Sequence, residues 1–378
     1  KQCRIGDIYA ERSQRGASDM ELLSVTMNDG VMPRSEIEGK DNSSEDKSNY
    51  KVVLTGDMVY NSMRMWQGAN GISPCDGIVS PAYTVLMPKI PICNGYFAAF
   101  FKSPNLINEF RKNSQGMTSD TWNLKYPQIE TIKVCIPALS EQNRVADMLG
   151  TLERRIAKQV QLVDSLKKYK RGLLSREFGQ QENGVLNNRY VGKLKDYFHL
   201  SSGSTPSSTN RAFYSGNIRW VSSGELKPKY LCETSQHISS EAVSSCNLRE
   251  YPANTLLVAM YGLEAAGVRG TASILSVPAT ISQACMAIQQ TGEIDIEYLY
   301  YWYIYNGQWI GIRIAQGTKQ QNLSTDTLGN LRIHAPSCSK QKKVCKLLSQ
   351  IDYLIEKECK KIDLLSSVKR GLLQQLFI

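Results

Sequence analysis

The sequence of 378 residues is 42% hydrophobic and 21% charged, so it is long enough to bury two ordinary cores. It has no run of the roughly 18 to 20 apolar residues that a membrane span needs, and its ten cysteines include no C-x-x-C pair, which argues against a membrane protein and favours a reducing cytoplasm. The formal net charge of +10 and the pI near 9.0 indicate a polyanionic partner.

Residues 1–131 contain short apolar and aromatic runs broken by Gly, Pro, Asn and Ser, which predicts strands and turns with few helices. We expect strands at 51–55 and 57–60, a helix at 95–112, and then a polar loop at 113–123. No signal peptide is predicted at the start, which is Lys1 rather than Met and leaves the extent of N-terminal trimming open.

A long helix is predicted after Pro137, with Ser140 as its N-cap and Phe178 near its end. At 1.5 Å per residue it would span roughly 58 Å, a length that favours a coiled coil. Gln159, Lys167 and Lys168 are predicted to lie off the apolar seam, in solvent. The seam itself has steps of three and four residues and consists of Val145, Leu149, Leu152, Ile156, Val160, Val163 and Leu166.

Residues 190–330 have the same character as the first 131, with strands expected at 255–260 and 284–288, a helix at 296–312 and a loop at 315–322. A second long helix then follows Pro336, with Ser339 as its expected N-cap. Glu358, Lys360 and Lys361 are predicted to be solvated. The apolar seam of this helix consists of Val344, Leu348, Ile351, Ile355, Cys359, Ile362 and Leu365.

The two long segments are copies of each other, because residues 132–178 align without a gap on residues 331–377 at an offset of 199. Of the 47 aligned pairs, 15 are identical, whereas chance would give about two or three. The repeat is too long for a solenoid unit and predicts two whole domains that are each followed by the same helix. We therefore predict an α+β fold with a pseudo-twofold internal repeat, in which two similar domains (1–131 and 190–330) are separated by two long antiparallel coiled-coil helices (132–189 and 331–378).

Nucleic acid is favoured over membrane as the polyanion, because basic residues alternate with aromatic and amide side chains on predicted loops. For any one of these residues the alternative is an ordinary surface or turn residue, and the alternative for Trp66, Trp122 and Trp220 is a core position. The residues that we expect at the interface are Arg64, Trp66, Gln67, Arg111, Lys112, Trp122, Asn123 and Lys125 in the first half, and Ser204, Thr205, Arg211, Ser222, Ser223, Glu225, Tyr261, Arg269, Lys319, Gln320 and Asn322 in the second.

The residues that would carry catalysis are missing from the sequence. The three histidines have no metal-ligand spacing, and the stretch 262–267 lacks the Lys-Ser/Thr that completes a P-loop. Cys338, Cys345 and Cys359 are expected to be small buried thiols rather than metal ligands. We therefore expect no catalytic residues and no metal in this chain, and any catalysis belongs to a partner.

The repeated pattern Pro-x-x-Ser-x-Gln, followed by a helix that ends Lys-Arg-Gly-Leu-Leu-x-x-x-Phe, resembles the specificity subunits of type I restriction-modification systems. The stretches 202–207, 218–226 and 257–262 look like blocks of a target recognition domain, as do 56–61, 66–69 and 77–83 in the first half. The resemblance covers essentially the whole chain. At residues 338–341 the second copy departs from the more usual Leu-x-Glu-Gln, so identical partner contacts at the two ends are not expected.

The resemblance implies a non-catalytic subunit that reads a bipartite DNA sequence, one half-site for each target recognition domain. It implies two modification subunits as partners, which bind S-adenosylmethionine and methylate a flipped-out adenine, and restriction subunits that use ATP and Mg. A pure coiled-coil scaffold and a stand-alone nuclease or methyltransferase are the alternatives. The first leaves the basic loops without a purpose, and the second lacks every catalytic motif.

Overall fold

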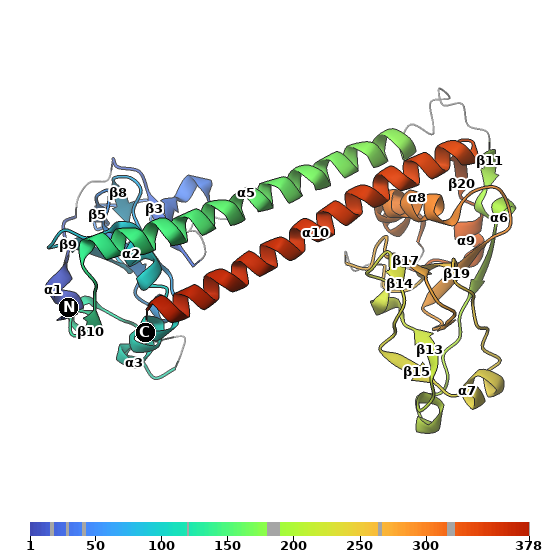
Figure 1. The fold of residues 1–378 in the computed structure, drawn as a ribbon, viewed down its shortest axis with the longest axis horizontal. Coiled ribbons are helices and arrows are strands. Elements are labelled where there is room, and N and C mark those ends of the chain that lie inside the picture. Colours follow the sequence, from blue (N-terminus) through green and yellow to red (C-terminus); the bar gives the residue numbers. More distant parts are fainter. Residues whose placement is uncertain are drawn as a thin grey trace. The chain divides into compact units, whose positions relative to one another are not determined.

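The computed structural model describes residues 1–15, 19–27, 30–39, 43–118, 121–179, 190–263, 267–315 and 322–377. The chain forms two compact units: unit 1 is Lys1–Leu162 with Glu358–Ile378, and unit 2 is Val163–Lys357. Each unit contains strands and short helices together with parts of two long helices, α5 (Leu139–Phe178) and α10 (Cys338–Leu376) (Figure 1). The mixed content of helices and strands agrees with the predicted α+β class.

Unit 1 is built on a four-stranded antiparallel sheet with the strand order β2-β9-β6-β7. Its main core packs Tyr9, Met58 and Leu86 from this sheet against the aromatic side chains of Phe97 and Phe101. Three two-stranded ladders, β1–β10, β3–β4 and β5–β8, surround it. The elements are β1 (Gln2–Arg4), α1 (Ile5–Ile8), β2 (Tyr9–Glu11), β3 (Leu23–Thr26), β4 (Gly30–Pro33), η1 (Arg34–Glu36), β5 (Lys51–Val53), β6 (Met58–Asn61), η2 (Met65–Gln67), β7 (Asn70–Ile72), β8 (Gly77–Val79), β9 (Tyr83–Pro88), α2 (Asn94–Phe100), α3 (Pro104–Asn113), α4 (Tyr126–Ile129) and β10 (Lys133–Cys135).

Unit 2 is built on a five-stranded sheet with the order β12-β19-β16-β17-β14, and a three-stranded sheet has the order β15-β13-β18. Figure 1 shows β13, β15 and α7 at the end of this unit farthest from α8, where Trp220, Ile238 and Leu248 form a small separate core. The elements are β11 (Tyr190–Lys193), α6 (Leu194–Tyr197), β12 (Phe198–Ser202), η3 (Arg211–Tyr214), β13 (Ile218–Val221), η4 (Ser223–Glu225), β14 (Tyr230–Leu231), β15 (Gln236–Ile238), α7 (Ser240–Ser245), β16 (Leu256–Ala259), β17 (Ala272–Leu275), β18 (Thr280–Ile281), β19 (Cys285–Gln290), α8 (Ile296–Trp309), the π-helical segment η5 (Ile310–Ile314), α9 (Thr325–Gly329) and β20 (Arg332–Ala335).

The two units share one topology. The order β2-β9-β6-β7 in unit 1 corresponds to β12-β19-β16-β17 in unit 2, and the ladder β1–β10 corresponds to β11–β20. In both units that ladder joins the first strand of the globular part to the strand that leads into a long helix. The four strands that the sequence predicts overlap β5, β6, β16 and β19, and each predicted end lies within two residues of the observed end.

The helix predicted at 95–112 is two helices in the structure, α2 and α3. The break follows from Pro104, which has no N–H to continue a helix, and from Ser103, whose hydroxyl caps α3 by accepting a hydrogen bond from Leu106 N at 3.4 Å. The corresponding helix of unit 2 has no such break, and α8 continues into η5.

The long helices begin at Leu139 and Cys338, so Ser140 and Ser339 lie in the first turn and the prediction that they are N-caps was wrong. The repeated glutamine two positions later organises these ends instead. Gln142 donates to Pro137 O at 3.1 Å, and Gln341 donates to Pro336 O at 2.9 Å. Their carboxamide oxygens accept the N–H of Cys93 at 3.0 Å and the N–H of Asp295 at 2.8 Å, which ties α2 and α8 to the long helices.

One turn of the predicted seam was assigned to the wrong face. Val160, which was predicted on the seam, is 41% exposed. Gln159 is only 8% exposed and donates a hydrogen bond to Glu358, so the prediction that Gln159 and Glu358 are solvated was wrong. Positions 152, 156, 159, 163 and 166 keep the alternating steps of four and three that face a partner helix, and residue 160 lies beside that line. The other predicted seam residues are buried or half-buried, and Lys167, Lys168, Lys360 and Lys361 are exposed as expected.

Candidate nucleic-acid interface

In unit 1 the predicted residues gather around a pair of tryptophans. The rings of Trp66 and Trp122 lie 5.1 Å apart, edge to face, although 56 positions separate them in the chain. Trp66 belongs to η2, which ends at Gly68 in the left-handed conformation (φ +87°), and its indole N–H donates to Met63 O at 3.1 Å. Both rings are half-buried, so they are neither full core residues nor free surface.

The loop that carries Trp122 is fixed by backbone hydrogen bonds on both sides. Gln115 and Asn123 exchange two hydrogen bonds, of 2.9 and 2.8 Å, and Leu124 N donates to Ser62 O at 2.8 Å. Ser62 lies two residues before Arg64, so the structure places Arg64, Trp66, Gln67, Trp122, Asn123 and Lys125 in one region. Arg64 and Lys125 are exposed there, where a cationic side chain can meet a phosphate.

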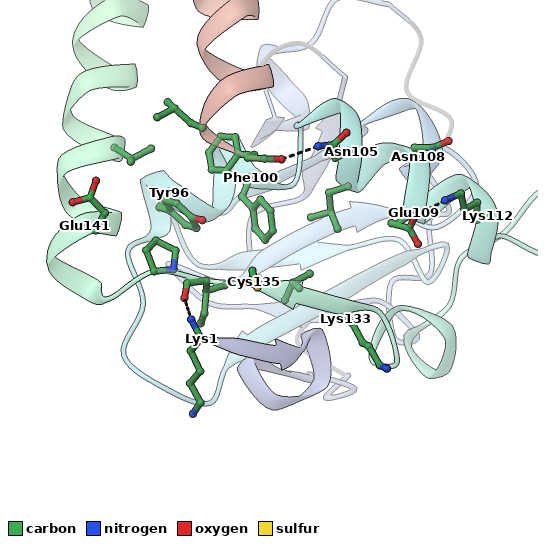
Figure 2. A pocket seen from close by; sticks show the side chains of 17 residues that line it. Lys1, Tyr96, Phe100, Asn105, Asn108, Glu109, Lys112, Lys133, Cys135 and Glu141 are labelled. Carbon is green, nitrogen blue, oxygen red and sulfur yellow. Dashed lines mark hydrogen bonds and ion pairs between the residues drawn. The ribbon is translucent and has the colours of Figure 1, made fainter.

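Arg111 and Lys112 lie in the last turn of α3 and already have partners. Lys112 Nζ lies 2.6 Å from Glu109 Oε1, and Arg111 donates to Asn108 Oδ1 at 3.3 Å. Lys112 also lines a cavity of about 690 Å³ in unit 1, whose wall includes the aromatic rings of Tyr96, Phe100 and Phe377 (Figure 2). Lys112 is therefore the least well placed of the basic residues predicted in the first half.

In unit 2 the Ser-Gly-Ser-Thr block is held against the edge of β18. A Cβ on Gly203 would lie 2.3 Å from Ile281 O, so only glycine fits this approach. Ser204 N donates to Ile281 O at 3.2 Å, and Ser204 O accepts from Trp220 Nε1 at 3.3 Å. Thr205 Oγ1 accepts from Gln283 N at 3.1 Å. Ser204 and Thr205 are exposed, but their polar backbone and hydroxyl groups mainly build this turn.

Glu225 closes a capping box rather than offering a free carboxylate. Its Oε2 accepts the N–H and the hydroxyl of Ser222, both at 2.8 Å, and its Oε1 accepts Ser235 N at 2.6 Å. Burial alone would raise the pKa of Glu225, but the hydrogen bonds from Ser222 and Ser235 outweigh burial and hold that pKa below its ordinary value. The ionised carboxylate therefore fixes the loop around Ser223, and we expect its role to be structural.

The remaining residues of the second half are spread over several loops and short helices. Arg211 is exposed at the start of η3, and Asn322 is exposed just before α9. Arg269 Nε donates to Leu263 O at 2.6 Å, and its side chain packs over Gly311, where a Cβ would lie 2.8 Å from Arg269 Cγ. Tyr261 is 38% exposed. Lys319 and Gln320 lie outside the described residues.

Sequence reasoning missed a polar cluster in unit 2 that is centred on Lys229. Its ammonium group pairs with Glu297, lies 2.6 Å from Ser349 Oγ and 2.9 Å from Tyr301 OH, and stands 4.5 Å from the centre of the Tyr301 ring. The Tyr301 hydroxyl also donates to Asp352 at 2.8 Å. No local pattern could have revealed this cluster, because Lys229 and Glu297 are 68 positions apart.

The expectation that the helix cysteines are small buried thiols holds for one of them. Cys345 is buried, Cys359 is half-buried, and Cys338 is exposed, because it occupies the first position of α10. Cys345 lies close to the carboxylates of Asp295 and Glu297. Those carboxylates already accept from Glu297 N at 2.7 Å and from Lys229, and burial raises the pKa of the Cys345 thiol, so the group fits a packed helix contact better than a metal site.

Comparison with known proteins finds one class of protein to which parts of this chain are similar. Residues 189–366 match the family model described as the type I restriction modification DNA specificity domain. The specificity subunit of the MjaIX type I restriction enzyme of Methanocaldococcus jannaschii is 29% identical over 192 residues, which are 50% of this chain and 43% of that protein. The EcoR124I/EcoR124II specificity subunit of Escherichia coli is 25% identical over 219 residues, 57% of this chain and 52% of that one. This chain thus spans about half the length of the curated relatives that it matches.

Solved structures show the same fold at low identity. The S subunit of a type I restriction-modification system from M. genitalium has a TM-score of 0.62 at 13% identity, over 100% of this chain and 96% of that one. The HsdS subunit of Thermoanaerobacter tengcongensis has a TM-score of 0.53 at 14% identity, with the same coverage. Residues 189–366 are thus similar to a type I restriction modification DNA specificity domain, and the curated relatives that match about half of the chain are specificity subunits of type I restriction enzymes.

No helix among the described residues is long and apolar enough to cross a membrane.

Proposed function

We propose that this chain reads a bipartite DNA sequence with two target recognition domains, residues 1–131 and 190–330. The long segments 132–189 and 331–378 would act as an antiparallel coiled-coil spacer that sets the distance between the half-sites. The observation that carries the proposal is the duplication of the globular domain. Residues 190–330 lie within the match to a DNA specificity domain, and residues 1–131 have the same strand order.

Two kinds of contact are proposed for the first half-site. Arg64 and Lys125 are exposed cations and would meet phosphates, which gives affinity without sequence information. Gln67 and Trp122 belong to the same region and would read base edges, because an amide can pair with a base and an aromatic ring can pack on one. Trp66 supports Trp122 through the ring contact, and Asn123 shares its loop.

For the second half-site the exposed residues Ser204, Thr205, Arg211, Tyr261 and Asn322 are the proposed contacts. Arg269, Lys319 and Gln320 are further candidates for contacts with this half-site. Ser222, Ser223 and Glu225 would act on DNA through the shape of their loop, since Glu225 has its acceptors occupied by the loop itself. Arg111 and Lys112 would contribute through charge at the edge of the first domain.

We propose as partners two modification subunits, which would bind S-adenosylmethionine, and restriction subunits, which would bind ATP and Mg. The complex would act on double-stranded DNA in the cytoplasm. The first turns of the two long helices differ, with Glu141 in α5 and Lys340 in α10 at equivalent positions. We therefore expect the two ends to differ in how strongly they hold a modification subunit.

The test is DNA binding by the chain assembled with its modification subunits. Arg64→Glu or Lys125→Glu is expected to weaken binding to every sequence by about tenfold and to lower the slope of affinity against salt, if each side chain meets a phosphate. Gln67→Ala should instead change the preference for the first half-site. Lys167→Glu is the matched control, because Lys167 is an exposed lysine of α5 outside the recognition domains. Equal losses for Arg64→Glu and Lys167→Glu would contradict the proposed interface.

A further inference from the structure

The long helices meet in unit 1 through a polar pair in the middle of the seam. Gln159 of α5 donates a hydrogen bond from Nε2 to Glu358 Oε2 of α10. Gln159 is 8% exposed, the Glu358 side chain is 15% exposed, and Lys361 Nζ lies 3.4 Å from the same carboxylate oxygen. The offset of 199 maps residue 159 onto residue 358, so this contact joins two equivalent positions of the repeat.

Two ion pairs flank that contact, and they are also related by the repeat. In unit 1 Lys369 Nζ lies 2.7 Å from Glu153 Oε1, and in unit 2 Lys170 pairs with Asp352. The offset maps Lys170 onto Lys369 and Glu153 onto Asp352. Each helix therefore carries one lysine and one acid, each lysine pairs with the acid of the other helix, and the offset of 199 maps one ion pair onto the other. This reciprocity is the contact pattern of an isologous two-fold interface.

Because the pattern is self-complementary, two copies of the same helix from two chains would meet in the same register. The flanking pairs would survive in either case, as Lys170 with Glu153 between two α5 helices and as Lys369 with Asp352 between two α10 helices. The central contact would not survive equally. Two Gln159 amides can bond to each other, whereas two Glu358 carboxylates would face each other in a largely buried seam and repel.

We infer that the Gln159–Glu358 pair directs α5 to pair with α10 and excludes the corresponding surface of a second copy of this chain. If the α5 helices of two chains pair with each other, the two α10 helices can pair only with each other. One carboxylate, at Glu358, is therefore enough to disfavour the whole exchanged assembly. The inference depends on contacts within the units and not on the proposed DNA contacts.

The experiment refolds two differently tagged full-length chains together from denaturant and measures mixed dimers by tandem affinity capture and light scattering. Glu358→Gln should raise the mixed-dimer fraction roughly tenfold over the parent, which corresponds to one like-charge contact of about 1.4 kcal/mol. The swapped variant Gln159→Glu with Glu358→Gln restores one amide and one carboxylate, and it should return to the parental fraction. Mixed dimers in which α5 of one copy pairs with α10 of another can form equally well in the parent, in Glu358→Gln and in the swapped variant. They contribute a constant background to the mixed-dimer fraction.

Two results would overturn the inference. One is a Glu358→Gln chain that forms no more mixed dimers than the parent. The other is a swapped variant that forms as many as Glu358→Gln, because the gain would then come from loss of a carboxylate at residue 358 itself. Gln159→Glu alone supplies a second measurement, since it places two carboxylates together within one chain. It should lower the melting temperature at neutral pH, and an unchanged melting temperature would also contradict the inference.

Discussion

The two units attach their globular parts to the long helices in the same place but with different chemistry. In both units a glutamine in the first turn of one long helix accepts a hydrogen bond from the start of a shorter helix, α2 or α8. An aromatic pair joins the same shorter helix to the end of the other long helix: the ring centres of Tyr96 and Phe377 lie 5.3 Å apart, and those of Tyr298 and Phe178 lie 5.1 Å apart. Between these two contacts unit 1 has two small residues, Gly95 and Ala146, which pack closely: a Cβ on Gly95 would lie 3.1 Å from Ala146 Cβ.

At the equivalent positions unit 2 has Glu297 and Cys345, and Glu297 pairs with Lys229. The comparison shows that a duplicated plan keeps its end contacts while the surface between them diverges. Unit 1 depends there on close packing, which is insensitive to pH and salt. Unit 2 depends on a largely buried ion pair, which is costly to break from one side only.

The largest difference is expected from a charge placed in the helix seam. Ile351 is 4% exposed and belongs to the core of unit 2, whereas its equivalent Leu152 is only half-buried. Ile351→Asp should destabilise the chain by about 4 to 5 kcal/mol, and Leu152→Asp by about 2 kcal/mol. Urea unfolding followed by circular dichroism measures both. Equal losses would mean that the seam is buried alike at both positions.

A smaller difference should come from the Lys229 cluster. Lys229→Ala leaves Glu297 without its cation beside Ser349 and should cost about 3 kcal/mol in unit 2. Lys227→Ala is the matched control, because Lys227 is an exposed lysine two residues away. Hydrogen exchange of α8 and α2, followed by mass spectrometry, reports each unit separately. Faster exchange in both helices would show that the attachments are not independent.

The smallest effect concerns pH. Burial would raise the pKa of Glu297, but hydrogen bonds from Lys229 and Ser349 and the charge of Lys229 hold it below the ordinary value of 4.5. A group with a lowered folded pKa contributes stability above about pH 4.5 and loses it as the pH falls through the folded pKa. Protection of α8 should therefore fall, as the pH is lowered below about 4.5, more in the parent than in Glu297→Gln. An equal fall in both chains would assign the pH dependence to other groups.

The sequence predicted what local periodicity records. Stripes at steps of three and four predicted both long helices, although these begin at Leu139 and Cys338, before the predicted N-cap serines, and short apolar runs broken by turn residues predicted the strands. The prediction of the seam failed at residue 160, because it selected Val160 for being apolar. The alternating steps of four and three place the polar Gln159 on the seam instead. The helix at 95–112 was predicted as one piece although Pro104 interrupts it.

Contacts between distant positions could not be predicted in this way. Trp66 and Trp122 were both chosen from the sequence, yet nothing local indicated that their rings meet. Glu225 was chosen as a polar loop residue, and the structure shows its carboxylate occupied by Ser222 and Ser235. No sequence pattern predicts the contacts of Lys229, because its partners come from α8 and α10. Residue type thus gave candidates for an interface, and the fold decides which of their side chains remain available.

The central claim is that the two units have one plan but read DNA independently. The most direct test exchanges residues 190–330 for the corresponding domain of a relative and maps methylated sites in a host that carries the modification subunits. The account predicts one changed half-site, with the other half-site and the gap between them unchanged. A motif that changes in both halves, or a gap of altered length, would contradict it.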